Sequence, residues 1–146
     1  MSLVVDASVA AKWFVREDLS DEAAELLGYF DRLCSVDLLI AEVTNIAWKK
    51  LTLGVIAPAQ AADMAKGIRA AISKLYPSGL FNERALQLAT ELRHSVYDCL
   101  YLACAEALDA PLVTADRQFS RKAQDAGFDK IVFALGAKPI SAMIRR

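Results

Sequence analysis

The chain has 146 residues, of which 55% are hydrophobic and 24% are charged, and its formal net charge at pH 7 is −1. This length predicts one domain, residues 1–146, with enough apolar material for a core. The near-neutral charge excludes a protein that holds nucleic acid by phosphate attraction alone. No segment approaches the roughly 18 consecutive apolar residues of a membrane span, and Asp6 stands where a signal peptide is apolar. We therefore expect a cytoplasmic protein with no membrane partner.

The first third of the chain alternates short apolar runs with helical patterns. Leu3–Val5 has the apolar, β-branched character of a buried parallel strand. A short helix is expected over Val9–Val15. Ser20 is expected to cap a second helix, because acidic residues follow it and apolar residues recur at helical spacing. A short strand is expected near Cys34–Val36.

The middle of the chain is predicted to be mainly helical. The pattern predicts a helix over Leu38–Leu53 that ends at Gly54. Pro58 fits the first turn of another helix, which runs to about Ile72. The Pro77–Gly79 segment is a loop, and a further helix follows it from about Phe81 to Leu92.

The last third again combines strands and helices. The expected elements are a helix at Val96–Leu108, a strand at Leu112–Thr114, a helix at Arg117–Ala126 and a strand at Ile131–Phe133. Strands separated by helices imply right-handed crossovers and a parallel sheet with both faces covered. The expected fold class is therefore α/β, a three-layer α/β/α sandwich with a short parallel sheet.

Three cysteines, Cys34, Cys99 and Cys104, lie within apolar surroundings. Their number is odd, and their neighbours do not give the Cys and His spacing of a zinc site. We expect them to be reduced core residues. The C-terminal Arg145 and Arg146 are expected to be disordered.

Two aspartates follow the two most clearly apolar strands. Asp6 comes directly after Leu3–Val5, and Asp116 comes shortly after Leu112–Thr114. The carboxyl ends of parallel strands meet at one rim of the sheet, where ligands bind in open α/β folds. Either aspartate could also simply cap the helix that follows it.

Two further acidic residues lie on predicted helices. Glu42 shares a helical stripe with Asn45 and Lys49, so it could equally belong to a solvated face. Asp98 completes a capping box with Ser95 at the start of an apolar helix. A carboxylate at the edge of the core is costly unless hydrogen bonds or a cation compensate its charge.

Together, Asp6, Glu42, Asp98 and Asp116 predict a site for a divalent metal ion. Clustered carboxylates suit Mg²⁺ or Mn²⁺, which prefer oxygen ligands, whereas zinc would call for His or Cys. Such an ion can polarise a phosphoryl group, lower the pKa of its bound water and neutralise the leaving oxyanion. The pattern therefore indicates a metal-dependent nuclease.

With these four acids, the chain resembles the PIN-domain ribonucleases and, among them, the VapC-like toxins of type II toxin–antitoxin systems. The resemblance covers nearly the whole chain. Its motifs, in order, are Val4–Ser8 with Lys12 and Trp13, Glu42 with Asn45, His94–Ala103, and Leu112–Asp116. Each motif is short, and their order and spacing make the resemblance specific.

The resemblance implies an endoribonuclease that depends on Mg²⁺ or Mn²⁺ and uses Asp6, Glu42, Asp98 and Asp116 as its catalytic and metal-binding acids. Ser8, Thr114 and Asn45 match family positions near these acids: the two hydroxyls would hold carboxylates, and Asn45 would orient the glutamate or serve a structural role. It also implies an RNA substrate, a homodimer and a cognate antitoxin, with no direct contact to DNA. A groove lined by Trp13, Phe14 and the apolar side of the second helix would suit an amphipathic antitoxin segment.

Alternative functions fit the same residues less well. A phosphoacceptor receiver domain normally pairs acids near its first strand, and a haloacid-dehalogenase-like phosphatase needs a second Asp where Ser8 stands. A catalytically silent PIN-like module that binds RNA or protein is the stronger alternative. His94, the sole histidine, is interpreted as a loop or capping residue outside the site. The scattered lysines and arginines are either an RNA-binding rim or solvated surface, with Arg117 the best placed.

Overall fold

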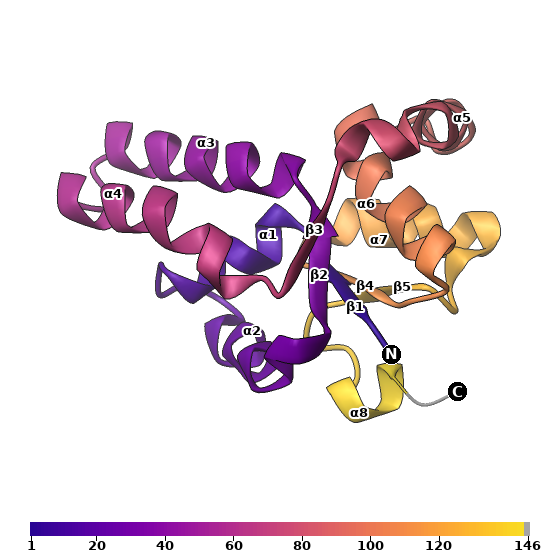
Figure 1. The fold of residues 1–146 in the computed structure, drawn as a ribbon, viewed down its shortest axis with the longest axis horizontal. Coiled ribbons are helices and arrows are strands. Elements are labelled where there is room, and N and C mark those ends of the chain that lie inside the picture. The colour runs from indigo at the N-terminus through magenta and orange to yellow at the C-terminus, as the bar shows by residue number, and fades with distance from the viewer. Residues whose placement is uncertain (145–146) are drawn as a thin grey trace.

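A parallel sheet forms the centre of the molecule (Figure 1), and the computed structural model describes residues 1–144. The sheet has five strands in the order β3-β2-β1-β4-β5, and every neighbouring pair is parallel. The strands are β1 (Leu3–Val5), β2 (Leu33–Val36), β3 (Lys74–Tyr76), β4 (Leu112–Thr114) and β5 (Val132–Ala134). The expectation for Arg145 and Arg146 lies outside the described residues.

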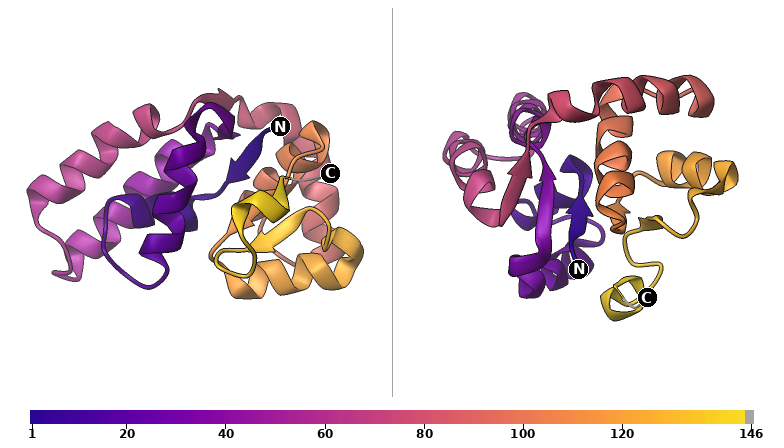
Figure 2. Two further views of the ribbon diagram at one scale, coloured as in Figure 1. Left: turned by 90° about the horizontal axis from the view of Figure 1, so that it is seen from below. Right: turned by 45° about the vertical axis from the view of Figure 1, so that its right-hand side comes forward.

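Helices cover both faces of this sheet, which confirms the predicted three-layer α/β/α arrangement. One side carries α1 (Ala7–Ala10), α2 (Ser20–Leu26), α3 (Leu38–Thr52) and α4 (Pro58–Gly67), as Figure 1 and Figure 2 show. The other side carries α5 (Asn82–Leu92), α6 (Val96–Leu108) and α7 (Arg117–Ala123), and a short helix α8 (Ile140–Met143) ends the described chain.

The two central strands, β1 and β4, bring the segments that contain Asp6 and Asp116 side by side. In the β1–β4 pair, Val5 lies opposite Val113, so Asp6, which follows β1, lies beside Thr114, the last residue of β4. All residues of β1 and β4 are buried, so this register is fixed by the core on both faces of the sheet. The rim beyond β1 and β4 is therefore where a site can be built.

Helix α6 brings a third acid to the same region. Ser95 is its N-cap and accepts a hydrogen bond from the Asp98 backbone N–H, as the capping box predicts. The helix is buried from Cys99 to Ala105 and packs against β1 and β2. Burial on all sides fixes the rotation of the helix, and with it the place of Asp98 in the first turn.

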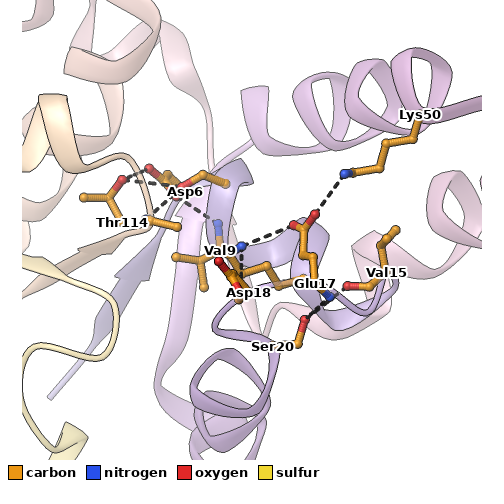
Figure 3. Close-up of polar contacts among 11 residues, drawn as sticks. Asp6, Val9, Val15, Glu17, Asp18, Ser20, Lys50 and Thr114 are labelled. Atoms are coloured by element: carbon orange, nitrogen blue, oxygen red, sulfur yellow. Dashed lines mark hydrogen bonds and ion pairs between the residues drawn. The ribbon is translucent and has the colours of Figure 1, made fainter. Parts of the chain in front are cut away.

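A cluster of charged side chains ties the segment after β1 to α3. Glu17 accepts hydrogen bonds from Lys12 Nζ at 3.2 Å and from Lys50 Nζ at 2.9 Å (Figure 3). Lys12 Nζ also donates to the backbone oxygen of Asp18 at 2.7 Å. These contacts hold the loop before α2 against α3, the helix that carries Glu42.

Several predicted element boundaries are wrong. Helix α1 begins two residues earlier than predicted, covers Ala7–Ala10 and continues as a 3₁₀ turn to Trp13. Helix α4 ends at Gly67 and continues as a 3₁₀ turn over Ile68–Ala71, and α7 ends at Ala123 and continues as a π-helical turn over Gln124–Phe128. Ser20 is the first residue of α2 and not its cap: its hydroxyl accepts from the backbone N–H of Glu17 and donates to the Val15 oxygen. The last strand is Val132–Ala134, one residue later than predicted.

Two elements, β3 and α8, are absent from the sequence-based expectation. The cysteine prediction is confirmed, because Cys34, Cys99 and Cys104 are all free and buried. Within residues 1–144, the structure contains no helix with the length and apolar character to cross a membrane.

Candidate metal-dependent active site

Asp6 is the most deeply placed of the predicted acids, with 4% of its surface exposed. It is the N-cap of α1, and its Oδ1 accepts from the Val9 backbone N–H at 3.2 Å. Oδ1 also accepts from the Ser8 hydroxyl at 2.6 Å, and Oδ2 accepts from the Thr114 hydroxyl at 2.5 Å. Figure 3 shows the contact between Asp6 and Thr114 across the two strand ends. The capping role is therefore present, together with a set of donors that orients both carboxylate oxygens.

The environment of Asp6 works against its charged form. Burial raises the pKa of the Asp6 carboxyl from its ordinary 3.8 to about 6. Hydrogen bonds from Ser8 and Thr114 oppose this rise in pKa, and the nearby charge of Asp98 adds to it. Hydrogen bonds fix the orientation of this carboxylate, but burial destabilises its negative charge. A bound cation would offset that cost.

Thr114 and Ser8 connect the Asp6 carboxylate to the start of α7. Thr114 Oγ1 accepts from the Asp116 backbone N–H at 3.1 Å, and Ser8 Oγ accepts from the Ala115 N–H at 2.9 Å. Asp116 is the N-cap of α7, where its Oδ1 accepts from the Phe119 N–H at 3.0 Å. Two hydroxyl groups thereby fix the positions of two aspartates from opposite ends of the chain.

Glu42 lies on α3 and turns toward α6. Its Oε1 accepts from the Tyr101 hydroxyl at 2.5 Å. Burial raises the pKa of the Glu42 carboxyl above its ordinary value, the hydrogen bond from Tyr101 counteracts this, and the charge of Asp98 adds to the rise. Burial also raises the pKa of the Tyr101 phenol strongly, so this residue stays a hydrogen-bond donor. Glu42 is therefore part of the acidic cluster and not of a solvated face.

Asp98 has an unexpected partner in His94. The His94 Nε2 atom lies 2.5 Å from Asp98 Oδ2, and the imidazole is largely buried, with 11% of its side chain exposed. One potential ligand atom from each of His94, Asp98 and Asp116 lies within 4.8 Å of the other two. The structure therefore places His94 at the site, whereas the sequence interpretation left it outside.

All four predicted acids line one cavity of about 420 Å³ beyond the carboxyl ends of the central strands. Its other lining residues are Ala7, Ser8, Leu38, Ala41, Asn45, Ile46, Lys49 and Tyr97. Thr114 is fully buried beneath it. Asn45 lies one turn after Glu42 on the cavity wall, and its predicted orienting role stays a prediction. The structure thus brings together Asp6, Glu42, Asp98 and Asp116 from four separate segments.

The donor set of this cavity fits a hard divalent cation. Four carboxyl groups face one ammonium group, that of Lys49, among the lining residues. Such an excess of negative charge repels a phosphate, and a divalent ion both neutralises it and matches its oxygen donors. The four acids are the candidate ligands of such an ion. Potential ligand atoms of Asp98 and Asp116 lie within 4.8 Å of each other and of a His94 ring nitrogen, and among the described residues this close group does not include Asp6 or Glu42, which line the same cavity.

Sequence reasoning missed three residues of the site, namely His94, Tyr97 and Tyr101. Tyr101 follows Asp98 by three positions, so its hydroxyl group in an otherwise apolar helix was a readable signal. Tyr97 precedes Asp98 and is 60% exposed, which places an aromatic ring at the cavity mouth. The sequence shows that His94 precedes Asp98 by four residues, but it does not show that the His94 imidazole points toward Asp98.

The remaining basic residues have varied positions. Lys49 lines the cavity, while Lys50 is bound to Glu17 and Arg16 to Asp21. Arg117 lines a separate hollow between α7 and the segment after β5. Lys49 is therefore better placed than Arg117 to meet a substrate at the acids.

Known proteins provide an independent comparison. The PIN domain family model matches residues 3–125. Ribonuclease VapC3 of Pyrobaculum aerophilum is 32% identical over 124 residues, which cover 84% of this chain and 95% of that relative. The crystal structure of PAE2754 from Pyrobaculum aerophilum has a TM-score of 0.66 and 26% sequence identity, covering 84% of this chain and 86% of that one. The matched region contains all four acids of the cavity.

Proposed function

Because the chain belongs to the PIN-domain family, we propose that it is an endoribonuclease that depends on Mg²⁺ or Mn²⁺ and acts as the toxin of a toxin–antitoxin pair. One observation carries the catalytic part of this proposal. Asp6, Glu42, Asp98 and Asp116 come from four distant segments and line a single cavity. The similarity to Ribonuclease VapC3 supports RNA as the substrate and the toxin role.

The cavity residues divide the work of phosphodiester hydrolysis. A bound divalent ion would polarise the phosphoryl group and lower the pKa of a water molecule. The four carboxylates would hold that ion, and Ser8, Thr114 and Tyr101 keep three carboxylate oxygens in fixed directions. Lys49 on the cavity wall supplies a cation for a phosphate of the chain, and the exposed ring of Tyr97 offers a surface on which an unpaired base can stack.

The proposal also includes a cytoplasmic homodimer that binds a cognate antitoxin and makes no direct contact with DNA. A separate hollow of about 240 Å³ is lined by apolar residues that include Trp13, Phe14 and Leu27 and by the polar residues Lys12, Arg16 and Ser20, and this mixed surface could accept an amphipathic antitoxin segment. Trp13 donates its indole N–H to the Ala23 oxygen at 2.8 Å. The indole therefore forms a fixed wall of this hollow.

Cleavage of RNA by the purified protein tests the catalytic part. We expect single-stranded or structured RNAs to be cut in Mg²⁺ or Mn²⁺ and to stay intact in EDTA. Asp98→Asn should abolish cleavage. The control Asp63→Asn changes an exposed acid on α4 that does not line the cavity, and it should leave cleavage unchanged. Induced expression in bacteria should arrest growth for the wild type and not for Asp98→Asn.

The alternative is a catalytically silent module that binds RNA or protein. Intact RNA in every sample, from folded wild-type protein that binds Mn²⁺, would contradict the nuclease proposal for the RNAs tested. Growth arrest by Asp98→Asn as strong as that of the wild type would contradict a toxicity that depends on catalysis.

A further inference from the structure

We propose that His94 and Lys122 form a positioning pair for the metal site, in which neutral His94 donates its Nε2–H to Asp98 and Lys122 fixes this tautomer. The inference rests on the proposed metal-dependent function, because it concerns how one of the metal-binding carboxylates is held. Three contacts carry it: His94 Nε2 to Asp98 Oδ2 at 2.5 Å, Lys122 Nζ to His94 Nδ1 at 3.4 Å, and Lys122 Nζ to the Arg93 oxygen at 2.9 Å.

The chemistry of the two side chains determines where the imidazole proton lies. A lysine ammonium group has donors and no acceptor, so in its contact with Lys122 the His94 Nδ1 atom must be the acceptor. A neutral imidazole with an accepting Nδ1 carries its proton on Nε2. That proton points to Asp98 Oδ2, which leaves the other carboxylate oxygen, Oδ1, for a cation.

The surroundings hold the imidazole in this orientation. The ring centroids of His94 and Phe119 lie 4.9 Å apart, and Phe119 is fully buried in α7. Lys122 stands on the same helix, and its second contact, to the Arg93 oxygen, keeps its ammonium group at the turn before α6. The imidazole therefore has contacts on its Nδ1 side, its Nε2 side and its ring.

The pair also connects the two helices that carry metal-binding acids. Asp116 is the N-cap of α7, and Asp98 lies in the first turn of α6. Lys122 on α7 reaches the segment just before α6, so the contact fixes the start of one helix against the other. A second effect of the pair is thus to tie the last turn of α7 to the segment that leads into α6.

Direct metal ligation by His94 is the competing arrangement, because its ring nitrogen lies within 4.8 Å of potential ligand atoms of Asp98 and Asp116. To bind an ion through Nε2, His94 would have to move its proton to Nδ1. There the proton would face the Lys122 ammonium group, and the Lys122 contact would break. The observed contacts favour a positioning role.

Metal affinity separates this role from simple packing. We expect His94→Leu to weaken Mn²⁺ binding about 10- to 100-fold in titration calorimetry, as loss of a hydrogen bond to a ligating group typically does. His94→Gln should stay within a few-fold of the wild type, because its amide nitrogen can reach the position of Nε2 and donate to Asp98. Lys122→Met should weaken binding a few-fold. Thermal unfolding without metal checks that each variant is folded. Unchanged Mn²⁺ affinity in His94→Leu would overturn the inference.

Nuclear magnetic resonance tests the tautomer directly, because His94 is the sole histidine of the chain. With ¹⁵N-labelled protein at about pH 8, we expect a protonated Nε2 and an unprotonated Nδ1, both without metal and with saturating Mg²⁺. A protonated Nδ1 in either state, or a shift of the proton from Nε2 to Nδ1 when Mg²⁺ is added, would overturn the inference in favour of direct ligation or another arrangement.

The outcomes for this inference and for the proposed function are distinct. Wild-type protein that binds no Mn²⁺ would overturn the metal site and the positioning role together. Protein that binds metal and shows the expected tautomer, but cuts no RNA, would count against the nuclease alone.

Discussion

Asp6→Asn should abolish RNA cleavage and metal binding and yet make the metal-free protein more stable at neutral pH. The physical reason is the burial of the Asp6 carboxylate, which raises its pKa from 3.8 to about 6. A rise of this size corresponds to about 3 kcal/mol of folding free energy lost when the group is ionised. Asparagine removes the buried charge, and its side-chain oxygen can still accept from the Val9 N–H.

The stabilisation by Asp6→Asn should depend on pH in a defined direction. Because the folded pKa of Asp6 lies above the unfolded one, folding takes up a proton between these two values. The wild type therefore loses stability from this group as the pH rises from about 4 to about 6, with no further loss above that range. The difference in unfolding free energy between variant and wild type should grow over the same interval and then level off.

Urea unfolding in EDTA, from about pH 4 to about pH 8, measures this difference. Added Mg²⁺ should stabilise the wild type and not Asp6→Asn. The exposed acid variant Asp63→Asn serves as the control and should follow the wild type at every pH. If Asp6→Asn is less stable than the wild type at neutral pH in EDTA, the charge of Asp6 does not destabilise the metal-free fold, and this explanation is wrong.

Thr114→Val should weaken metal binding about 10- to 100-fold and lower the unfolding free energy by about 2 kcal/mol. The Thr114 hydroxyl donates to Asp6 Oδ2 and accepts from the Asp116 N–H, and valine has the same shape without these contacts. Loss of the donor also raises the pKa of Asp6 further, so metal binding should begin at a higher pH than in the wild type.

Thr114→Ser is the matched control, because serine keeps the hydroxyl group and loses only a methyl group. Its metal affinity should stay close to that of the wild type, although the small cavity costs about 1 kcal/mol of stability. Calorimetry with Mn²⁺ and urea unfolding measure both quantities. Equal loss of metal affinity in the valine and serine variants would show that packing at this position matters and the hydroxyl group does not.

The central strands could be predicted from the sequence because their residues form short, mostly β-branched apolar runs, which are typical of buried parallel strands. Leu3–Val5 and Leu112–Thr114 are short, apolar and buried on both faces, and the structure places strands at these residues. The sequence indicated that both strands end at the same rim, and the structure shows that they are neighbours, which puts Asp6 beside Thr114. The two acids that follow these strands were therefore within reach of sequence reasoning.

The outer elements could not be predicted in the same way. Strand β3 lies at the edge of the sheet, and its residues, Lys74 to Tyr76, are exposed or half-buried, so they lack the apolar run of a central strand. Helix α8 has only four residues, too few to show a helical period. Strand β5 was found but displaced by one residue, because its apolar run is longer than its pairing with β4.

The polar contacts within the site depend on packing that a single sequence does not reveal. Tyr101 bonds to a glutamate 59 positions away, and Lys122 contacts a histidine 28 positions away. Sequence patterns indicated which acids could meet, since Asp6 and Asp116 follow strand ends that share one rim of the sheet. They did not indicate which neutral or basic groups would orient those acids.

The most direct test of this account is the position of a bound ion. Anomalous scattering from crystals soaked in Mn²⁺ would locate the metal without reference to activity. We predict a peak within coordination distance of carboxylate oxygens of Asp6, Asp98 and Asp116 in the cavity that also contains Glu42. A peak at another surface, or an empty cavity in crystals that accept Mn²⁺ elsewhere, would contradict the proposal that these four acids form one metal site.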